Sequence, residues 1–258
     1  MAQLLETKTA VIYGAGGAIG SAVARAFAHE GAHVHLTSHR LSSVEQIAAE
    51  IEAAGGKATA AEVDALDEHA IEEHLGNLIK DGKAIDISFN AVGFGEVQGV
   101  PLVDLSLRDF AYAIDSWSRT VFLTSRAAAR RMTAQGSGVI LTVKPPAEGT
   151  ALASGFGAAV ATIESISLML AAEVGPKGVR VLVLQPNALP ESETLQESFR
   201  KYASGLGIKA EDALVGLADT TMLRRLPTLE ELSNVASFVA SDKASALTGS
   251  VIKIDCGA

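Results

Sequence analysis

The chain is poor in cysteine, in aromatic side chains and in positive charge. Its 258 residues include a single cysteine, Cys256, and only 5% of them are aromatic. One cysteine excludes an internal disulfide and a metal site built from several thiolates. The 21 lysines and arginines stand against 30 acidic residues, a formal charge of −9, so electrostatics gives no support for a nucleic-acid partner.

Long hydrophobic runs and a basic leader are also missing. No apolar run approaches the length needed to cross a membrane, and the N-terminus lacks the basic-then-apolar pattern of a secretory signal. No HExxH motif or Cys/His cluster points to a metal. We therefore expect a soluble, cytoplasmic protein with no membrane partner and no metal.

A glycine turn lies near the start of the chain. Residues 9–13 form an apolar run typical of a strand buried on both faces. Gly14, Gly16 and Gly17 follow, and from Ile19 the apolar residues recur at helical spacing. Such a turn presents backbone N–H groups and the positive end of a helix dipole to an anion, which predicts a nucleotide-binding turn. The alternative is a purely structural glycine turn.

Strand-like and helix-like segments alternate along the whole chain. The expected strands cover residues 9–13, 33–38, 57–64, 85–92, 138–143, 180–185 and 250–255. This alternation predicts an α/β fold, a doubly wound parallel sheet of Rossmann type with helices on both faces, in a single domain over residues 1–258. Ligands of such sheets bind outside the carboxyl ends of the strands.

One stretch, residues 188–226, breaks the alternation. It is more polar than the rest, is punctuated by glycines and follows the sixth expected strand. An insertion of this length in a compact domain is more often functional than idle, so we predict a lid over the carboxyl edge of the sheet. The alternative is a disordered surface loop.

The strand-end motifs resemble those of the short-chain dehydrogenase/reductase family over nearly the whole chain. The family's TGxxxGxG motif is matched at Gly14 and Gly20, with tyrosine in place of the threonine and Ala18 in place of the middle glycine. The NNAG motif reads NAVG at 90–93, and the C-terminal TGxxxxxDGG pattern reads TG and DCG within 248–257. The resemblance implies an oxidoreductase that uses a nicotinamide dinucleotide.

The cofactor contacts follow from the resemblance and from the strand ends. They are expected at Gly14, Gly16, Gly17, Ala18, Ile19, Gly20, Ser38, Arg40, Asp64, Asn90, Ala91, Gly93 and Pro186. At the middle glycine position, the methyl group of Ala18 is expected to crowd the cofactor or to shift the turn.

The end of the second expected strand indicates which coenzyme binds. An NAD site carries a carboxylate about 20 residues beyond the glycine motif, whereas an arginine accommodates the 2′-phosphate of NADP. Here the stretch reads Ser38-His39-Arg40, and the first acid is Glu45. Arg40 offers a charged fork to a phosphate, which predicts NADP(H) rather than NAD(H). The alternative is an arginine that simply faces solvent.

The catalytic positions of the family carry other residues in this chain. The family uses an Asn, a Ser, a Tyr and a Lys; the Tyr hydroxyl donates a proton as hydride arrives. By resemblance, these positions fall on Trp117, Pro145, Phe156 and Val160 respectively, with Lys144 at the serine position if the alignment slips by one residue. None of the four supplies the usual group, so ordinary ketone–alcohol chemistry by the family mechanism is not expected.

Three functions therefore stay open. The first is an NADP(H)-dependent reductase whose substrate, an activated C=N, C=C or C=O group, needs no proton from the protein. The second is a nucleotide-binding protein without turnover, acting as a sensor or partner subunit, and the third is a non-redox enzyme that reuses the pocket. Lys144 is a candidate substitute acid beside the serine position; Glu148, Tyr112, Arg119 and Tyr202 are weaker candidates.

Partners are expected to be a small apolar molecule and further copies of this chain. Trp117, Phe156 and Val160 together with the insertion predict an apolar substrate pocket. The family resemblance implies a homodimer or homotetramer that pairs through the two long helical stretches, 106–132 and 155–174.

Overall fold

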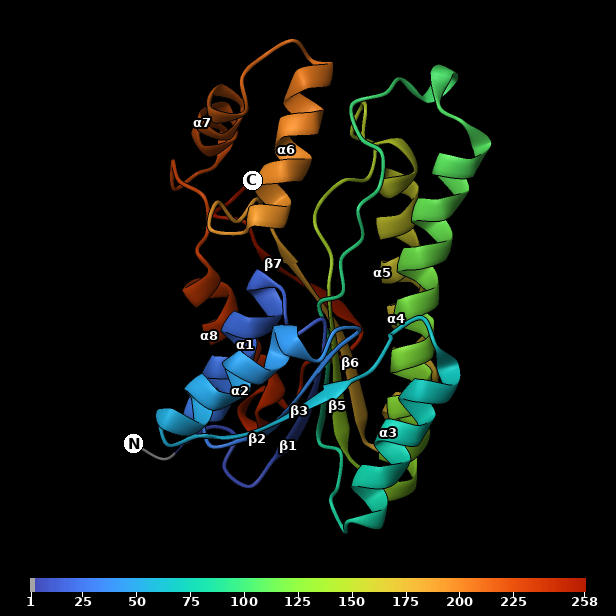
Figure 1. Ribbon diagram of the computed structural model, residues 1–258, viewed down its shortest axis with the longest axis vertical. Coiled ribbons are helices and arrows are strands. Elements are labelled where there is room, and N and C mark those ends of the chain that lie inside the picture. The colour runs from blue at the N-terminus through green and yellow to red at the C-terminus, as the bar shows by residue number, and fades with distance from the viewer. Residues whose placement is uncertain (1–2) are drawn as a thin grey trace.

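The computed structural model describes residues 3–258 and contains one seven-stranded parallel sheet (Figure 1). The strands follow the order β3-β2-β1-β4-β5-β6-β7. Their bounds are β1 Thr9–Tyr13, β2 His33–Ser38, β3 Lys57–Glu62, β4 Ile87–Asn90, β5 Gly138–Val143, β6 Val179–Pro186 and β7 Ser250–Ile254. The order reverses between β1 and β4, so their carboxyl ends flank the switch point where such sheets bind ligands.

Helices cover both faces of the sheet, as the alternation of the sequence predicts. One face carries α1 Ala18–His29, α2 Ser42–Ala53 and α8 Leu229–Ala240. The opposite face carries α3 Glu68–Lys80, α4 Leu107–Gln135 and α5 Ser154–Val174. Apolar residues of the strands pack against both layers, and this double burial explains why β1, β5 and β6 read as nearly continuous hydrophobic runs. The predicted fold class is confirmed.

The stretch that interrupts the alternation forms two helices rather than a structureless loop. They are α6, Glu193–Gly205, and α7, Ala210–Thr220, and they lie beyond the carboxyl ends of the strands (Figure 1). α6 approaches the loop after β4 backbone to backbone: a Cβ on Gly205 would lie 2.5 Å from the carbonyl oxygen of Gly99. A side chain at either glycine would therefore separate the helix from the loop.

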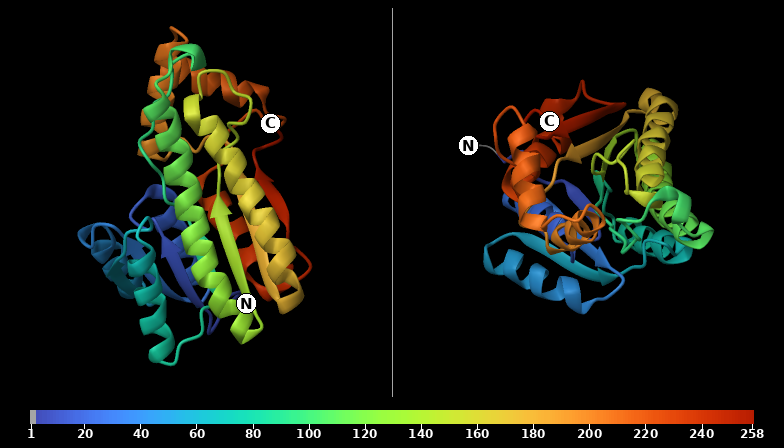
Figure 2. Two further views of the ribbon diagram at one scale, coloured as in Figure 1. Left: turned by 90° about the vertical axis from the view of Figure 1, so that its right-hand side faces the viewer. Right: turned by 90° about the horizontal axis from the view of Figure 1, so that it is seen from above.

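α5 is more apolar than the sequence analysis expected. Together with the turn that follows it, Ser154–Lys177, it is long and apolar enough to cross a membrane by length and composition alone. In the structure it runs beside α4 and packs on β6 (Figure 2). The expectation that no run approaches membrane-spanning length is thus wrong, because alanines and leucines lie on the exposed side of α5 as well as on its buried side. Only a third of its most apolar window is buried.

Candidate functional site

The glycine turn lies at the switch point and is built by close backbone packing. Gly14 adopts a left-handed φ of 74°, and a Cβ there would lie 2.7 Å from the carbonyl oxygen of Ala91 at the end of β4. A Cβ on Gly20 would lie 2.3 Å from the oxygen of Gly14. Both positions therefore require glycine, since only glycine adopts this turn without a clash.

The first turn of α1 faces the space outside the sheet. Gly17 is the N-cap residue and Ala18 is the first residue of the helix. The leading N–H groups of a helix have no partner within it, so those of Ala18 and Ile19 are placed to receive an anion together with the positive helix dipole. The helix begins directly after the turn despite the alanine; crowding of a bound cofactor by its methyl group stays a prediction.

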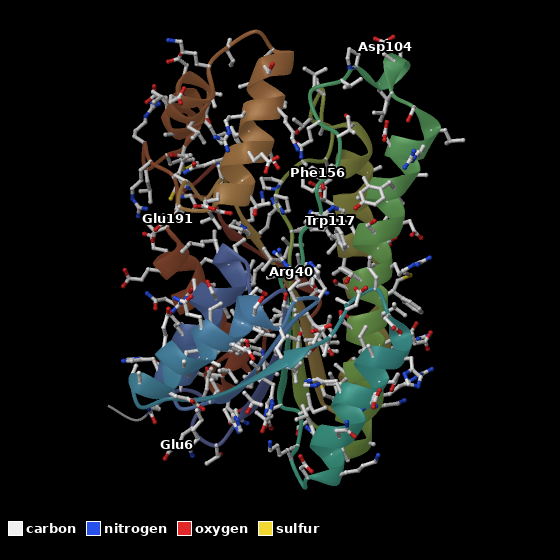
Figure 3. The ribbon with its side chains drawn as sticks, viewed as in Figure 1. Glu6, Arg40, Asp104, Trp117, Phe156 and Glu191 are labelled. Carbon is white, nitrogen blue, oxygen red and sulfur yellow. The ribbon has the colours of Figure 1, made fainter. Side chains whose placement is uncertain are left out.

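The residues after β2 form a compact hydroxyl-lined corner. The Ser43 hydroxyl donates to the Arg40 carbonyl oxygen at 2.7 Å, and its oxygen lies 2.9 Å from the Ser38 Oγ, within hydrogen-bond distance. The backbone N–H of Arg40 lies 3.3 Å from the same Ser38 Oγ. A Cβ on Gly16 would lie 2.6 Å from Ser43 Oγ, so the corner abuts the glycine turn. The Arg40 side chain is exposed beside it (Figure 3).

The ends of β3 and β4 hold two further predicted contacts. Asp64 is exposed, and its Oδ1 accepts a hydrogen bond from the N–H of Leu66 at 2.9 Å. Asn90 is buried: its Nδ2 donates to Thr124 Oγ1 at 2.8 Å, and its Oδ1 accepts from the Val92 N–H at 3.1 Å. The Asn90 side chain therefore holds the turn that follows β4 against α4. Ala91 and Gly93 belong to the same turn.

The end of β6 contributes a polar group that the sequence analysis did not select. Asn187 follows Pro186, is 5% exposed, and its Nδ2 has no hydrogen-bond partner among the described residues. Its Oδ1 accepts from the Ala188 N–H at 2.8 Å. Buried amide donors are almost always paired, so this orphaned donor at the carboxyl end of a strand fits a site that a ligand oxygen completes.

The positions that the resemblance assigns to catalysis lie together between α4 and α5. Val160 is fully buried, and Phe156 and Trp117 pack with it in a separate apolar cluster. The rings of Trp117 and Phe156 lie 5.4 Å apart, and Phe94 meets Trp117 edge-on at 5.7 Å. Phe94, Trp117 and Phe156 are here called the aromatic cluster. Figure 3 shows Trp117 and Phe156 next to one another on the side of these helices that faces α6.

Lys144, rather than Pro145, is the buried residue at the end of β5. The Lys144 side chain is 1% exposed, and its Nζ lies 2.8 Å from Glu164 Oε2 and forms a second ion pair with Glu148. Burial works to raise the pKa of Glu148, but the hydrogen bonds from Lys144 and from the backbone outweigh it, so the pKa lies below its usual range. Lys144 is thus held between two carboxylates.

Of the four weaker acid candidates, only Glu148 lies beside Lys144; the other three are spread over the molecule. Tyr112 is 49% exposed on α4, and Arg119 is exposed and pairs with Asp115 at 3.5 Å. Tyr202 is half-buried on α6 against Phe199, with ring centroids 6.2 Å apart. The structure brings none of these three into the group formed by Lys144 and its two carboxylates.

Glu96 is a site residue that sequence reasoning missed. It lies in the loop after β4, is 6% exposed, and accepts hydrogen bonds from Trp117 Nε1 at 3.2 Å and Gln98 Nε2 at 2.8 Å. A single glutamate in a glycine-rich loop carries no pattern that distinguishes it from a solvated one. Only the fold brings it against a tryptophan that is distant in sequence.

The family of the chain follows from comparison with known proteins. The family profile described as Enoyl-(Acyl carrier protein) reductase matches residues 14–258. YxbG, an uncharacterized oxidoreductase of Bacillus subtilis, is 32% identical over 256 residues, which cover 98% of this chain and 91% of YxbG. The chain belongs to the short-chain dehydrogenase/reductase family.

A further curated relative of this short-chain dehydrogenase/reductase is an oxidoreductase, and a solved structure shares its fold. The D-threitol dehydrogenase of Mycolicibacterium smegmatis is 29% identical over 260 residues, covering 98% of this chain and 93% of that enzyme. The crystal structure of NAD⁺-bound xylitol dehydrogenase matches with a TM-score of 0.91 at 23% identity, covering 98% of this chain and 99% of that one; at this identity it shows the fold alone. Members of the family bind nicotinamide cofactors.

The site fits a dinucleotide by its own geometry. The free N–H groups of the first turn of α1 suit a pyrophosphate, and the corner after β2 lies on one side of them. The orphaned amide of Asn187 lies on the other side of the switch point, at the end of β6. A dinucleotide bound across the carboxyl ends of the strands would reach both.

Proposed function

We propose that the protein is an NADP(H)-dependent oxidoreductase of atypical mechanism, which transfers hydride to an activated double bond, above all the C=N bond of an iminium group. The observation that carries the proposal is the apolar packing of Phe156 and Val160, the residues at the tyrosine and lysine positions. A phenylalanine ring has no proton to donate, and a fully buried valine cannot hold a charge.

The chemistry of an iminium group agrees with such a site. NADPH, when bound, would supply a hydride to the iminium carbon; the π electrons of the C=N bond would pass to nitrogen, giving a neutral amine and NADP⁺. No proton is needed, because the nitrogen already carries the positive charge. A ketone would need a proton on its oxygen, and loss of a positioned acid costs about 10² to 10⁴ in rate.

Replacement of the catalytic groups as a set also supports an altered mechanism. Trp117, Phe156 and Val160 form continuous apolar contacts, whereas loss of a single polar member would leave the others unpaired. Exchanging a whole hydrogen-bonded network for apolar groups costs little stability, whereas a half-satisfied network is costly. We infer that the site diverged as a unit.

The corner after β2 supports the choice of NADP(H). Ser38 and Ser43 supply hydroxyl groups, and the exposed Arg40 supplies a charge that no structural ion pair uses among the described residues. An anionic 2′-phosphate would be held there by charge-assisted hydrogen bonds, whereas NAD(H) offers only a hydroxyl.

Two measurements on the full chain test this function. Calorimetric titration should give a lower Kd for NADPH than for NADH, and consumption of NADPH should follow addition of cyclic iminium salts but not of matched ketones. Equal affinity for the two coenzymes would contradict the role of Arg40 in binding the 2′-phosphate. If ketones were reduced at rates comparable with those of the iminium salts, the proposed mechanism, in which the protein donates no proton, would be wrong.

A second candidate is a nucleotide-binding protein without turnover. It is favoured by Lys144, which Glu148 and Glu164 hold in place at the end of β5, where it is 1% exposed and not free to meet a substrate. Binding of NADPH with no consumption across panels of carbonyl compounds and iminium salts would select this candidate.

A further inference from the structure

Glu96 is a buried carboxylate whose close partners are all neutral. Its two oxygens accept from the amide of Gln98 and the indole N–H of Trp117. Within the described part of the chain, residues 3–258, no cation lies within 4.0 Å of it, and Lys201 on α6 acts on it only from farther away. Its negative charge is therefore poorly compensated.

An uncompensated buried charge is unfavourable unless a further group completes the site. Taking a carboxylate out of water costs several kcal/mol, and neutral donors recover only part of that cost. Consistent with this, burial raises the pKa of Glu96, and the hydrogen bonds from Gln98 and Trp117 only partly oppose the rise. A positively charged ligand group would supply what the protein itself does not.

The surroundings of Glu96 are suited to such a group. Phe94 comes from the same loop, Trp117 from α4 and Phe156 from α5, and all three residues are partly exposed. Aromatic faces attract cations through the ring quadrupole. A carboxylate among aromatic rings is a combination that recognises an organic cation.

The second group of charges beside the aromatic cluster is also net negative. Lys144 carries one positive charge, and its partners Glu148 and Glu164 carry two negative ones. Glu164 lies eight residues after Phe156 on α5, about two helical turns along the same helix. The field at this end of the site therefore favours a cation over a neutral or anionic molecule.

We propose that Glu96 and the aromatic cluster form a binding site for the positively charged nitrogen of an organic cation. This inference rests on the proposed function in one respect: it names the substrate class of that site as a preformed iminium or ammonium compound. The cation lies against the aromatic faces, and the carboxylate of Glu96 balances its charge. Binding itself makes and breaks no covalent bond.

A purely structural role for Glu96 predicts different behaviour. In that case the carboxylate only ties the loop after β4 to α4 through Trp117. Its replacement would then change stability and would alter the binding of charged and neutral ligands alike. Selectivity for charge is thus the readout that separates the two roles.

The test uses the only tryptophan of the chain, Trp117, as the reporter. The N-methyl-dihydroisoquinolinium cation and its neutral counterpart of similar shape, α-tetralone, are titrated while tryptophan fluorescence is followed. The wild-type protein should bind the cation at least about 10-fold more tightly than the ketone. Glu96→Gln, which keeps the shape and one acceptor, should reduce this preference to about twofold or less.

Two further variants keep the test decisive. Glu211→Gln removes an exposed charge on α7 and should leave the preference unchanged. Phe94→Leu removes one aromatic face while preserving the charges, and should weaken the cation several-fold and the ketone little. If Glu96→Gln fails to fold by circular dichroism, the Phe94→Leu result decides alone. An unchanged preference in Glu96→Gln, or equal binding of cation and ketone by the wild type, overturns the inference.

Failure of this inference is distinguishable from failure of the proposed function. Selective binding of the cation without NADPH consumption supports the site and overturns the hydride-transfer function. Reduction of an iminium salt with no charge preference in binding supports the function and overturns the site.

Discussion

Arg40 is the single side chain on which the choice of coenzyme depends. Arg40→Ala should raise the Kd of NADPH about 10- to 100-fold and that of NADH by less than about twofold, because hydrogen bonds to a charged group contribute about 1.5–3 kcal/mol. Isothermal titration calorimetry measures both. Arg25→Ala, which removes another surface arginine paired to Glu50 at 2.6 Å, is the matched control. Equal losses for both coenzymes would contradict the assignment.

Lys144 is the buried member of its ion-pair group. Removing the lysine should therefore cost a different amount of stability from removing its two carboxylate partners. Its partners are more than a third exposed, so water can solvate them when the lysine is removed. Lys144→Met, which nearly conserves volume, should cost less than about 1 kcal/mol. The double variant Glu148→Gln/Glu164→Gln leaves a buried ammonium unpaired and should cost about 3 kcal/mol. Urea unfolding measures both, and the reverse order would show that the carboxylates are the buried partners.

His35 should make the fold sensitive to acid. Burial, followed by the nearby charges of His33, Lys83 and His74, lowers its pKa from 6.5 to about 3, and neither ring nitrogen has a hydrogen-bond partner within residues 3–258. Above pH 6.5 the residue is neutral in both states and has no effect. Below pH 6.5 the imidazole becomes protonated in the unfolded chain but stays neutral in the native state. The free energy of unfolding therefore falls, by about 2 kcal/mol between pH 6.5 and pH 5.

The corresponding measurement compares urea midpoints at pH 7 and pH 5. His35→Leu should flatten the loss of stability on acidification, because the group that titrates only in the unfolded state is gone. His69→Gln, at a side chain that is 87% exposed, should leave the wild-type pH dependence intact. The same slope in His35→Leu as in the wild type would assign acid sensitivity to the carboxylates instead.

Among the helices, α8 has the most complete N-terminal cap. Thr228 accepts from the N–H of Glu231, and the Glu231 side chain accepts from the N–H of Thr228. The hydrogen bond from Arg225 and those from Thr228 lower the pKa of Glu231 to about 2. Thr228→Ala should lower the free energy of unfolding by about 1 kcal/mol. Thr220→Ala, at an exposed residue near the end of α7, should change it by less than half as much; equal effects in thermal unfolding would contradict a capping role.

For the whole molecule, the paired helices α4 and α5 leave an apolar surface uncovered. Phe122, Leu168 and Met169 are 47%, 39% and 57% exposed. We propose that a second copy of the chain covers these side chains, since large exposed apolar surfaces mark interaction sites. Light scattering should then give the wild-type protein a multiple of the chain mass, 26.6 kDa.

The variants that test this association introduce glutamate at exposed apolar positions on different parts of the surface. Leu168→Glu/Met169→Glu should shift the mass toward 26.6 kDa. Val103→Glu, at a side chain 93% exposed on the turn before α4, should not. A monomeric wild-type protein at micromolar concentration would remove the proposal.

The fold was predictable because its signals are local. Each strand lies within a few residues of its expected range, since buried parallel strands read as short apolar runs between glycine turns. The helices of the insertion were not predicted: Gly205 and Gly207 read as breaks, although Gly205 is the last residue of α6 and Gly207, with φ of 70°, ends the turn after it. Glycines mark helix ends as often as loops.

Sequence patterns point to the candidate site only where one segment builds it. The glycine turn and the corner at Arg40 each lie within one short stretch of chain, and the structure brings the two together. Glu96 meets Trp117, and Lys144 meets Glu164, only because different elements converge at the carboxyl edge of the sheet. Such pairs have no fixed spacing in sequence, so no pattern could have shown them.

The backbone contact between Gly99 and Gly205 has a kinetic consequence. Because no side chain separates α6 from the loop that carries Phe94 and Glu96, we expect displacement of the helix to free the loop, so that the two open as one unit. We expect a ligand to enter only after this opening. Its association should show a slow phase whose rate stops rising at high ligand concentration, and the backbone amides of both segments should exchange hydrogen with solvent at the same rate.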